Sequence, residues 1–173
     1  SNLHRYDGVK YGYRTPESVE ELRSLYRKSR AQGFGAQPKL RILMGMYVSA
    51  AQYSAQYYNR ALRVRSLIRR DFDEAFAKVD ALLTPSTPAP AFPIGGIYGD
   101  SVLMQYADQL LVTGNHAGVP GISVPAGFHE SGLPVGIHFF APDFREDTLF
   151  RAGYAYEKAM EGETWRKRKP AVK

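Results

Sequence analysis

Two charged side chains interrupt apolar helical sequence, and their chemistry suits a small charged ligand. Arg41 comes directly before Ile42-Leu43-Met44, and Asp108 follows Tyr106-Ala107. Burying either charge alone costs several kcal/mol, so each would require a partner of opposite charge. A guanidinium pairs with a carboxylate through two hydrogen bonds, and a carboxylate pairs with an ammonium group. Arg41 and Asp108 could therefore hold the head group of an α-amino acid. The alternative is that they pair with each other or with other side chains.

No hydrolytic nucleophile is recognisable in the sequence. Amide hydrolysis needs a nucleophile, a neighbouring base and donors for the oxyanion. The chain lacks G-x-S-x-G, S-x-x-K and a G-x-x-x-x-G-K-[ST] phosphate loop, and its histidines do not have the spacing of a metal site. We therefore assign no catalytic residue and no metal ligand. His116 is interpreted as structural, and His138 as packed or hydrogen-bonded within a strand.

Composition excludes several classes of protein. The 173 residues carry a net charge of +6, 44% of them are apolar, and there is no cysteine. This excludes intrinsic disorder, disulfides and Cys-ligated metals, and it is compatible with a reducing compartment. No apolar run approaches the ~20 residues that span a bilayer. The chain starts without Met, so we expect it to begin within a larger protein. Its basic charge permits an acidic partner such as RNA but does not require one.

The first half of the chain is predicted to be helical. The capping box Ser18-Val19-Glu20-Glu21 predicts a helix from about 19 to 31 that stops at Gly33. Pro38 suits the first turn of a second helix. The expected buried face of that helix comprises Leu40, Leu43, Met44, Tyr47 and Val48.

A third helix is predicted from an apolar stripe that runs at steps of three and four between residues 57 and 79. We expect this stripe to be buried. Four arginines lie largely off it, on a face that is either solvated or RNA-binding. They are Arg60, Arg63, Arg69 and Arg70.

The second half is predicted to alternate strands and helices. A strand at 80–84 precedes an extended proline loop at 85–93 and a helix at about 103–117. Strands at 122–126 and 134–140 form a hairpin that turns at 129–132, and a helix follows at about 146–160. The strands are continuously apolar, which predicts a sheet covered on both faces. The fold class is therefore α/β, a mixed sheet flanked by helices, followed by a basic tail at 162–173. That tail is either solvated or in contact with RNA or another protein of a complex.

Several stretches resemble the amidase-signature enzymes. They are Tyr6-Asp7-Gly8, Gly33-Phe34-Gly35 with Arg41-Ile42, Leu82–Pro85, Pro120–Pro125 and Gly132–Gly136. The likeness covers nearly the whole chain, up to about Ala159. The second half is shared by amidases generally, whereas the first half resembles the tRNA-dependent amidotransferases. Residues 1–173 are accordingly expected to form the C-terminal portion of an amidase-signature domain.

The resemblance implies a substrate-binding segment without its nucleophile. The family's Ser–cis-Ser–Lys triad lies upstream, in a Gly/Ser-rich stretch that this sequence does not contain. We therefore expect the segment alone to be inactive. The family pattern assigns Arg41 to the α-carboxylate of glutamine and Asp108 to its α-ammonium group. Lys39 is a weaker candidate than Arg41.

The implied parent enzyme hydrolyses glutamine and supplies ammonia for converting Glu-tRNA(Gln) to Gln-tRNA(Gln). The resemblance implies no cofactor in this chain, with ATP and Mg²⁺ used by the partner subunit. Its implied partners are amidotransferase subunits B and C, glutamine and, mainly through the partner subunit, Glu-tRNA(Gln). A cytoplasmic location without a membrane is expected. Two alternatives stay open: a general amidase of the same family, and a basic RNA-binding or assembly module.

Overall fold

The chain divides into two compact units, which are described separately. In this computed structural model, residues 2–97 and 99–168 are described. The first unit comprises residues 1–63 and the second residues 64–173, so that the boundary falls within helix α4 (Tyr58–Phe76).

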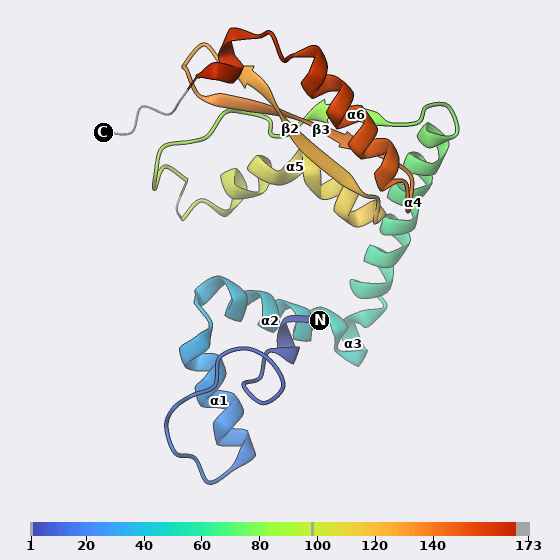
Figure 1. The fold of residues 1–173 in the computed structure, drawn as a ribbon. Coiled ribbons are helices and arrows are strands. Elements are labelled where there is room, and N and C mark those ends of the chain that lie inside the picture. The colour runs from blue at the N-terminus through green and yellow to red at the C-terminus, as the bar shows by residue number, and fades with distance from the viewer. Residues whose placement is uncertain (1, 98, 169–173) are drawn as a thin grey trace. The chain divides into compact units, whose positions relative to one another are not determined.

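The first unit is helical and has a small core. A 3-10 turn, η1 (Asn2–Arg5), precedes α1 (Leu22–Gly33), α2 (Ala36–Ser49), α3 (Ala51–Ser54) and the first turn of α4 (Figure 1). Leu25, Ser29 and Thr15 are buried. The Ser29 hydroxyl accepts a hydrogen bond from the backbone N–H of Thr15 at 3.1 Å, which fixes the loop before α1 against that helix.

Helix α1 begins later than the capping-box pattern predicts. It starts at Leu22 rather than near Val19, and its N-cap residue Glu21 makes no side-chain hydrogen bond. Glu17 explains the difference, because Lys28 and Gln32 of α1 donate to its carboxylate at 2.6 and 2.5 Å. This pairing holds the preceding segment alongside α1 instead of within it. The predicted stop at Gly33 is confirmed.

A three-stranded sheet organises the second unit. Its strands are β1 (Leu82–Pro85), β2 (Gly121–Phe128) and β3 (Pro134–Phe140), in the spatial order β1-β3-β2. The hairpin between β2 and β3 forms as predicted, with an irregularity between Pro125 and Gly127. The α/β class is confirmed. We expected a mixed sheet, but the described strands pair only antiparallel.

Helices cover both faces of this sheet, as the apolar strands predict (Figure 1). Side chains alternate along β3, so Phe139 and Phe140 point to opposite faces. Phe139 meets Tyr156 of α6 (Glu146–Ala159), with ring centroids 6.4 Å apart. Phe140 is buried against Phe72 of α4, with centroids 5.7 Å apart, and lies beside α5 (Ser101–Ala117). A 3-10 turn, η2 (Thr164–Lys167), follows α6 and contacts β2.

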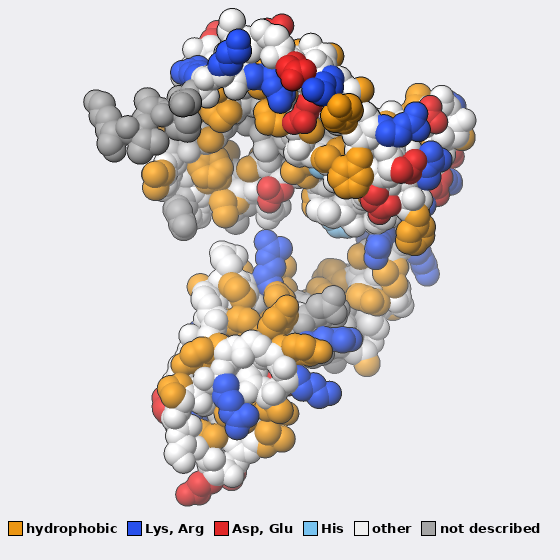
Figure 2. Space-filling view, viewed as in Figure 1, with side chains coloured by type: hydrophobic (Ala, Val, Ile, Leu, Met, Phe, Trp, Pro, Cys, Tyr) orange, Lys and Arg blue, Asp and Glu red, His pale blue; other side chains and the backbone are white. Residues whose placement is uncertain are grey.

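The apolar stripe of α2 and the N-terminal half of the α4 stripe are largely exposed, so their predicted burial is wrong for this chain. Ile68, Phe72 and Phe76 in the C-terminal half of α4 are half-buried. Neither helix contains a fully buried residue among those described. Leu43 of α2 is 62% exposed and Val64 of α4 is 48% exposed. Figure 2 shows hydrophobic side chains at the surface of both units. Apolar periodicity shows which face of a helix could be buried. It does not show whether another segment of the chain packs on that face.

Candidate functional site

The two predicted substrate-binding residues lie on exposed helix surfaces. Arg41 is in α2 and Asp108 is in α5. Among the described residues, neither side chain makes a hydrogen bond or ion pair within its own unit. Exposure removes the need for a buried counter-charge and leaves both groups available to a ligand. Because Arg41 belongs to the first unit and Asp108 to the second, their convergence on one ligand stays a prediction.

The helix that carries Asp108 is capped at both ends. The Asp100 carboxylate accepts from the backbone N–H groups of Val102 and Leu103 at 2.9 and 3.0 Å. Gly118 ends the helix in the left-handed conformation, at φ 79°. The Asp100 cap satisfies N–H groups that have no partner inside the helix. It accounts for a start at Ser101, slightly before the predicted Leu103.

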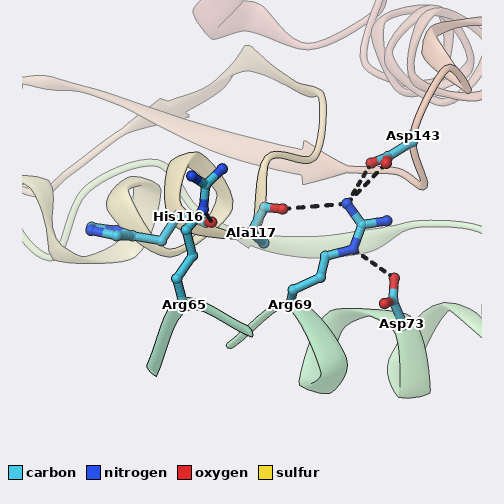
Figure 3. A network of polar contacts seen from close by, with 6 residues as sticks. All are labelled: Arg65, Arg69, Asp73, His116, Ala117 and Asp143. Carbon is cyan, nitrogen blue, oxygen red and sulfur yellow. Dashed lines mark hydrogen bonds and ion pairs between the residues drawn. The ribbon is translucent and has the colours of Figure 1, made fainter. Parts of the chain in front are cut away.

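Two arginines of α4 hold the C-terminal end of α5 (Figure 3). The Arg65 Nε–H donates to the His116 carbonyl at 2.7 Å, and Arg69 Nη1 donates to the Ala117 carbonyl at 3.3 Å. Positive charge is favourable at this end of a helix, where unpaired carbonyls gather partial negative charge. The arginines therefore fix the end of the helix on which Asp108 lies.

Arg69 is the centre of this network rather than part of a solvated or RNA-binding face. Its Nη1 donates to both carboxylate oxygens of Asp143 at 2.9 Å, and its Nε donates to Asp73 at 2.8 Å. The hydrogen bonds to Asp143 and then Asp73 raise the pKa of Arg69 above its ordinary value. Sequence reasoning missed these contacts, because Arg69 and Asp143 are 74 positions apart.

The proline loop and the N-terminal half of α5 enclose an apolar hollow of about 450 Å³. Pro88, Pro90 and Phe92 line it from the loop, and Tyr106 and Ala107 line it from the helix. Asp108 directly follows Ala107 but does not line the hollow, because adjacent residues of a helix do not share a face.

A chain of hydrogen bonds joins the start of the proline loop to the sheet. Ser86 Oγ donates to Ser123 Oγ at 3.3 Å, and Ser123 Oγ lies 2.7 Å from His138 Nδ1. Partial burial lowers the pKa of His138, which favours its neutral ring. The prediction that His138 is packed or hydrogen-bonded is confirmed. The irregularity between Pro125 and Gly127 shifts the register so that Ser123 pairs with His138. Sequence reasoning missed Ser123, because the predicted turn does not fix this shift.

His116 makes a hydrogen-bond contact within its own helix. His116 Nδ1 lies 2.7 Å from the Val112 carbonyl of its own helix, which agrees with a structural role. Within residues 2–97 and 99–168, no group of three His, Asp or Glu side chains is arranged to hold a metal ion. In the same part of the chain, no helix has the length and apolarity needed to cross a membrane. Lys169–Lys173 of the basic tail lie outside the described residues.

Comparison with known proteins gives one family and a set of longer relatives. The profile of the amidase family matches residues 1–150. The A subunit of glutamyl-tRNA(Gln) amidotransferase from Desulforudis audaxviator is 52% identical over 161 residues, which are 93% of this chain and 32% of that protein. Its counterpart in Synechococcus sp. is 46% identical over 172 residues, 99% of this chain and 35% of that protein. The chain therefore spans about a third of the length of these relatives.

Solved structures agree with the sequence matches. The crystal structure of the glutamyl-tRNA(Gln) amidotransferase A subunit from Thermotoga maritima is 30% identical, with a TM-score of 0.59, over 90% of this chain and 33% of that one. A crystal structure of an amidase, at 24% identity, superposes with a TM-score of 0.63 over 80% of this chain and 32% of that one. The second match concerns the fold alone.

Proposed function

The chain belongs to the amidase family, and on that basis we propose that it is the C-terminal part of the glutaminase subunit of a tRNA-dependent amidotransferase. The observation that carries the proposal is the 52% identity over 161 residues to the A subunit of a glutamyl-tRNA(Gln) amidotransferase. The matched residues cover 93% of the chain and so include parts of both units. The match favours the tRNA-dependent enzyme over a general amidase, because both curated relatives described above are A subunits of glutamyl-tRNA(Gln) amidotransferases.

In the proposed reaction, this chain binds glutamine and does not attack it. The Arg41 guanidinium binds the α-carboxylate, and the Asp108 carboxylate binds the α-ammonium group. Both side chains are exposed and without a partner in their own described unit, which leaves their hydrogen-bonding capacity for the substrate. Two charged contacts at the α-carbon leave the side-chain amide free for the nucleophile.

The nucleophile belongs to the part of the enzyme that this sequence does not contain. A serine there attacks the glutamine amide, which forms an acyl-enzyme and releases ammonia; water then releases glutamate. The ammonia passes to a partner subunit, where ATP-activated Glu-tRNA(Gln) becomes Gln-tRNA(Gln). We assign ATP and Mg²⁺ to that partner, and we place the enzyme in the cytoplasm as a complex with subunits B and C.

The proposal is tested by comparing the assembled complex with the 173-residue chain. We expect the complex to release ammonia from glutamine and to convert Glu-tRNA(Gln) to Gln-tRNA(Gln) when ATP is present. The chain alone should release no ammonia. Glutamine hydrolysis by residues 1–173 alone would contradict the assignment of the nucleophile. A complex that hydrolyses simple amides but never produces Gln-tRNA(Gln) would instead indicate a general amidase.

A further inference from the structure

An apolar pocket with cationic walls lies where η2 and Arg168 meet the β2–β3 hairpin. Its volume is about 240 Å³, and it is lined by Pro125 and Phe128 of β2, Pro134 of β3, and Trp165, Arg166 and Arg168 at η2. We refer to these residues as the tail pocket. Neither Arg41 nor Asp108 lines it, and it shares only Pro134 with the hollow beside the proline loop.

Both arginines of the tail pocket stack on aromatic rings. The guanidinium carbon of Arg168 lies 4.3 Å from the centroid of the Phe128 ring, and that of Arg166 lies 5.6 Å from the Trp165 ring. A guanidinium over an aromatic ring is held by cation–π attraction, which does not use its N–H groups as donors. These N–H groups can therefore donate to a ligand.

Few carboxylates compete for these cations. Arg166 Nη2 lies 3.9 Å from Glu157 Oε1, at the long limit of an ion pair. Glu161 is paired instead with Lys158, at 3.1 Å. Among the described residues, Arg168 has no carboxylate partner, and the exposed Lys167 makes no side-chain hydrogen bond or ion pair. Glu163 precedes η2 and is exposed.

We propose that the tail pocket binds a single-stranded segment of RNA, with a base against its aromatic and proline surfaces and the flanking phosphates on Arg166, Lys167 and Arg168. Aromatic rings and guanidinium planes are the surfaces on which unpaired bases stack, and arginine N–H groups bind phosphate oxygens. An acidic peptide would use the cations but would have no use for the ring faces. The inference rests on the proposed function, because that function supplies the RNA, a tRNA substrate.

Binding of tRNA by the assembled complex tests this inference. Arg166→Gln combined with Arg168→Gln should weaken tRNA binding and make its salt dependence shallower, because fewer counterions are released. For two lost single-strand phosphate contacts, the slope of log K against log salt concentration should fall by about 1.4. Trp165→Leu keeps an apolar side chain but removes the stacking ring, and should weaken binding about tenfold.

The matched control removes two positive charges elsewhere. Arg23 of α1 and Lys78 after α4 are both exposed, and Arg23→Gln combined with Lys78→Gln should leave affinity and salt slope unchanged. An equal effect from this control would show that net charge alone acts, and it would overturn the inference. So would unchanged binding by all the tail-pocket variants.

Photocrosslinking gives a second measurement, which reads proximity to RNA rather than a change in affinity. A p-benzoylphenylalanine at position 167 should crosslink to tRNA in the assembled complex. Crosslinks to protein subunits alone would overturn the inference. Failure of this inference is distinguishable from failure of the proposed function. If the wild-type complex forms Gln-tRNA(Gln) but the tail-pocket variants bind tRNA normally, only the RNA-binding role of the tail pocket is refuted.

Discussion

Arg69 Nη1 lies 2.9 Å from both carboxylate oxygens of Asp143, which joins α4 to the segment between β3 and α6. The same nitrogen reaches the Ala117 carbonyl at the end of α5. One side chain thus connects three parts of the second unit that are far apart in the sequence. Its loss should affect how these parts are held together.

Arg69→Met should lower the free energy of unfolding by about 1–2 kcal/mol, measured by urea denaturation. The variant removes charged hydrogen bonds but leaves acceptors that are partly exposed, so water recovers some of the loss. Arg70→Met is the matched control, since Arg70 makes a single exposed pair among the residues that the structure describes, with Glu74 at 3.6 Å. Equal losses from the two variants would contradict the network's role.

Arg41→Ala and Asp108→Asn, each in the assembled enzyme, should raise the KM for glutamine roughly 10–100-fold, because each loses a charged hydrogen bond to the substrate. Thermal unfolding should change little, because both side chains are exposed. Gln109→Ala, at the exposed neighbour of Asp108, serves as the control. Normal KM values in both variants would refute the assignment of this pair to glutamine.

Gly114→Ala should destabilise the chain by about 1–3 kcal/mol through overpacking. A Cβ at Gly114 would clash with Cε1 of the buried Phe140 ring. Gly153→Ala in α6 is the opposite case, because its Cβ would meet Val124 at an ordinary 3.6 Å. That variant should gain up to about 1 kcal/mol from the better helix propensity of alanine. Thermal melts of both variants would check the contrast in sign.

Asp100→Ala should lower stability by about 1 kcal/mol, since it deletes the side-chain cap of α5. Glu21→Ala at the start of α1 should cost much less, because Glu21 makes no capping hydrogen bond. Hydrogen exchange of the Val102 and Leu103 amides should accelerate in the Asp100 variant. Unchanged exchange at both amides would contradict the cap.

Acidification should destabilise the chain through His138. Burial lowers the pKa of His138 in the folded state, whereas an unfolded histidine titrates near about 6.5. Below that pH the unfolded state binds more protons than the folded state. The stability contributed by neutral His138 is therefore complete above about pH 6.5 and is lost as the pH falls through the folded pKa. Urea denaturation should therefore show wild type losing stability relative to His138→Gln as the pH drops. Parallel pH curves for the two proteins would refute this.

Local signals predicted much of the second unit. The turn at 129–132, flanked by continuous apolar runs, was sufficient for the β2–β3 hairpin, and the helical spacing before Gly118 and after Arg145 located α5 and α6. The capping-box pattern at Ser18 predicted too early a start for α1. Contacts from Lys28 and Gln32 to Glu17 oppose that earlier start. Apolar spacing also failed to predict burial for α2 and for the N-terminal half of α4, whose stripes stay largely exposed.

The order of amino acids alone was enough for the family resemblance, the α/β class, the lack of a recognisable nucleophile and the choice of Arg41 and Asp108 as candidates. The folded arrangement was needed to learn that Arg69 serves the end of α5, that Ser86 and Ser123 join His138, and that Arg168 stacks on Phe128. The difference lies in the range of the interactions. Turns, caps and helical faces arise from residues a few positions apart, whereas Arg65 meets His116 across 51 positions only after the chain has folded.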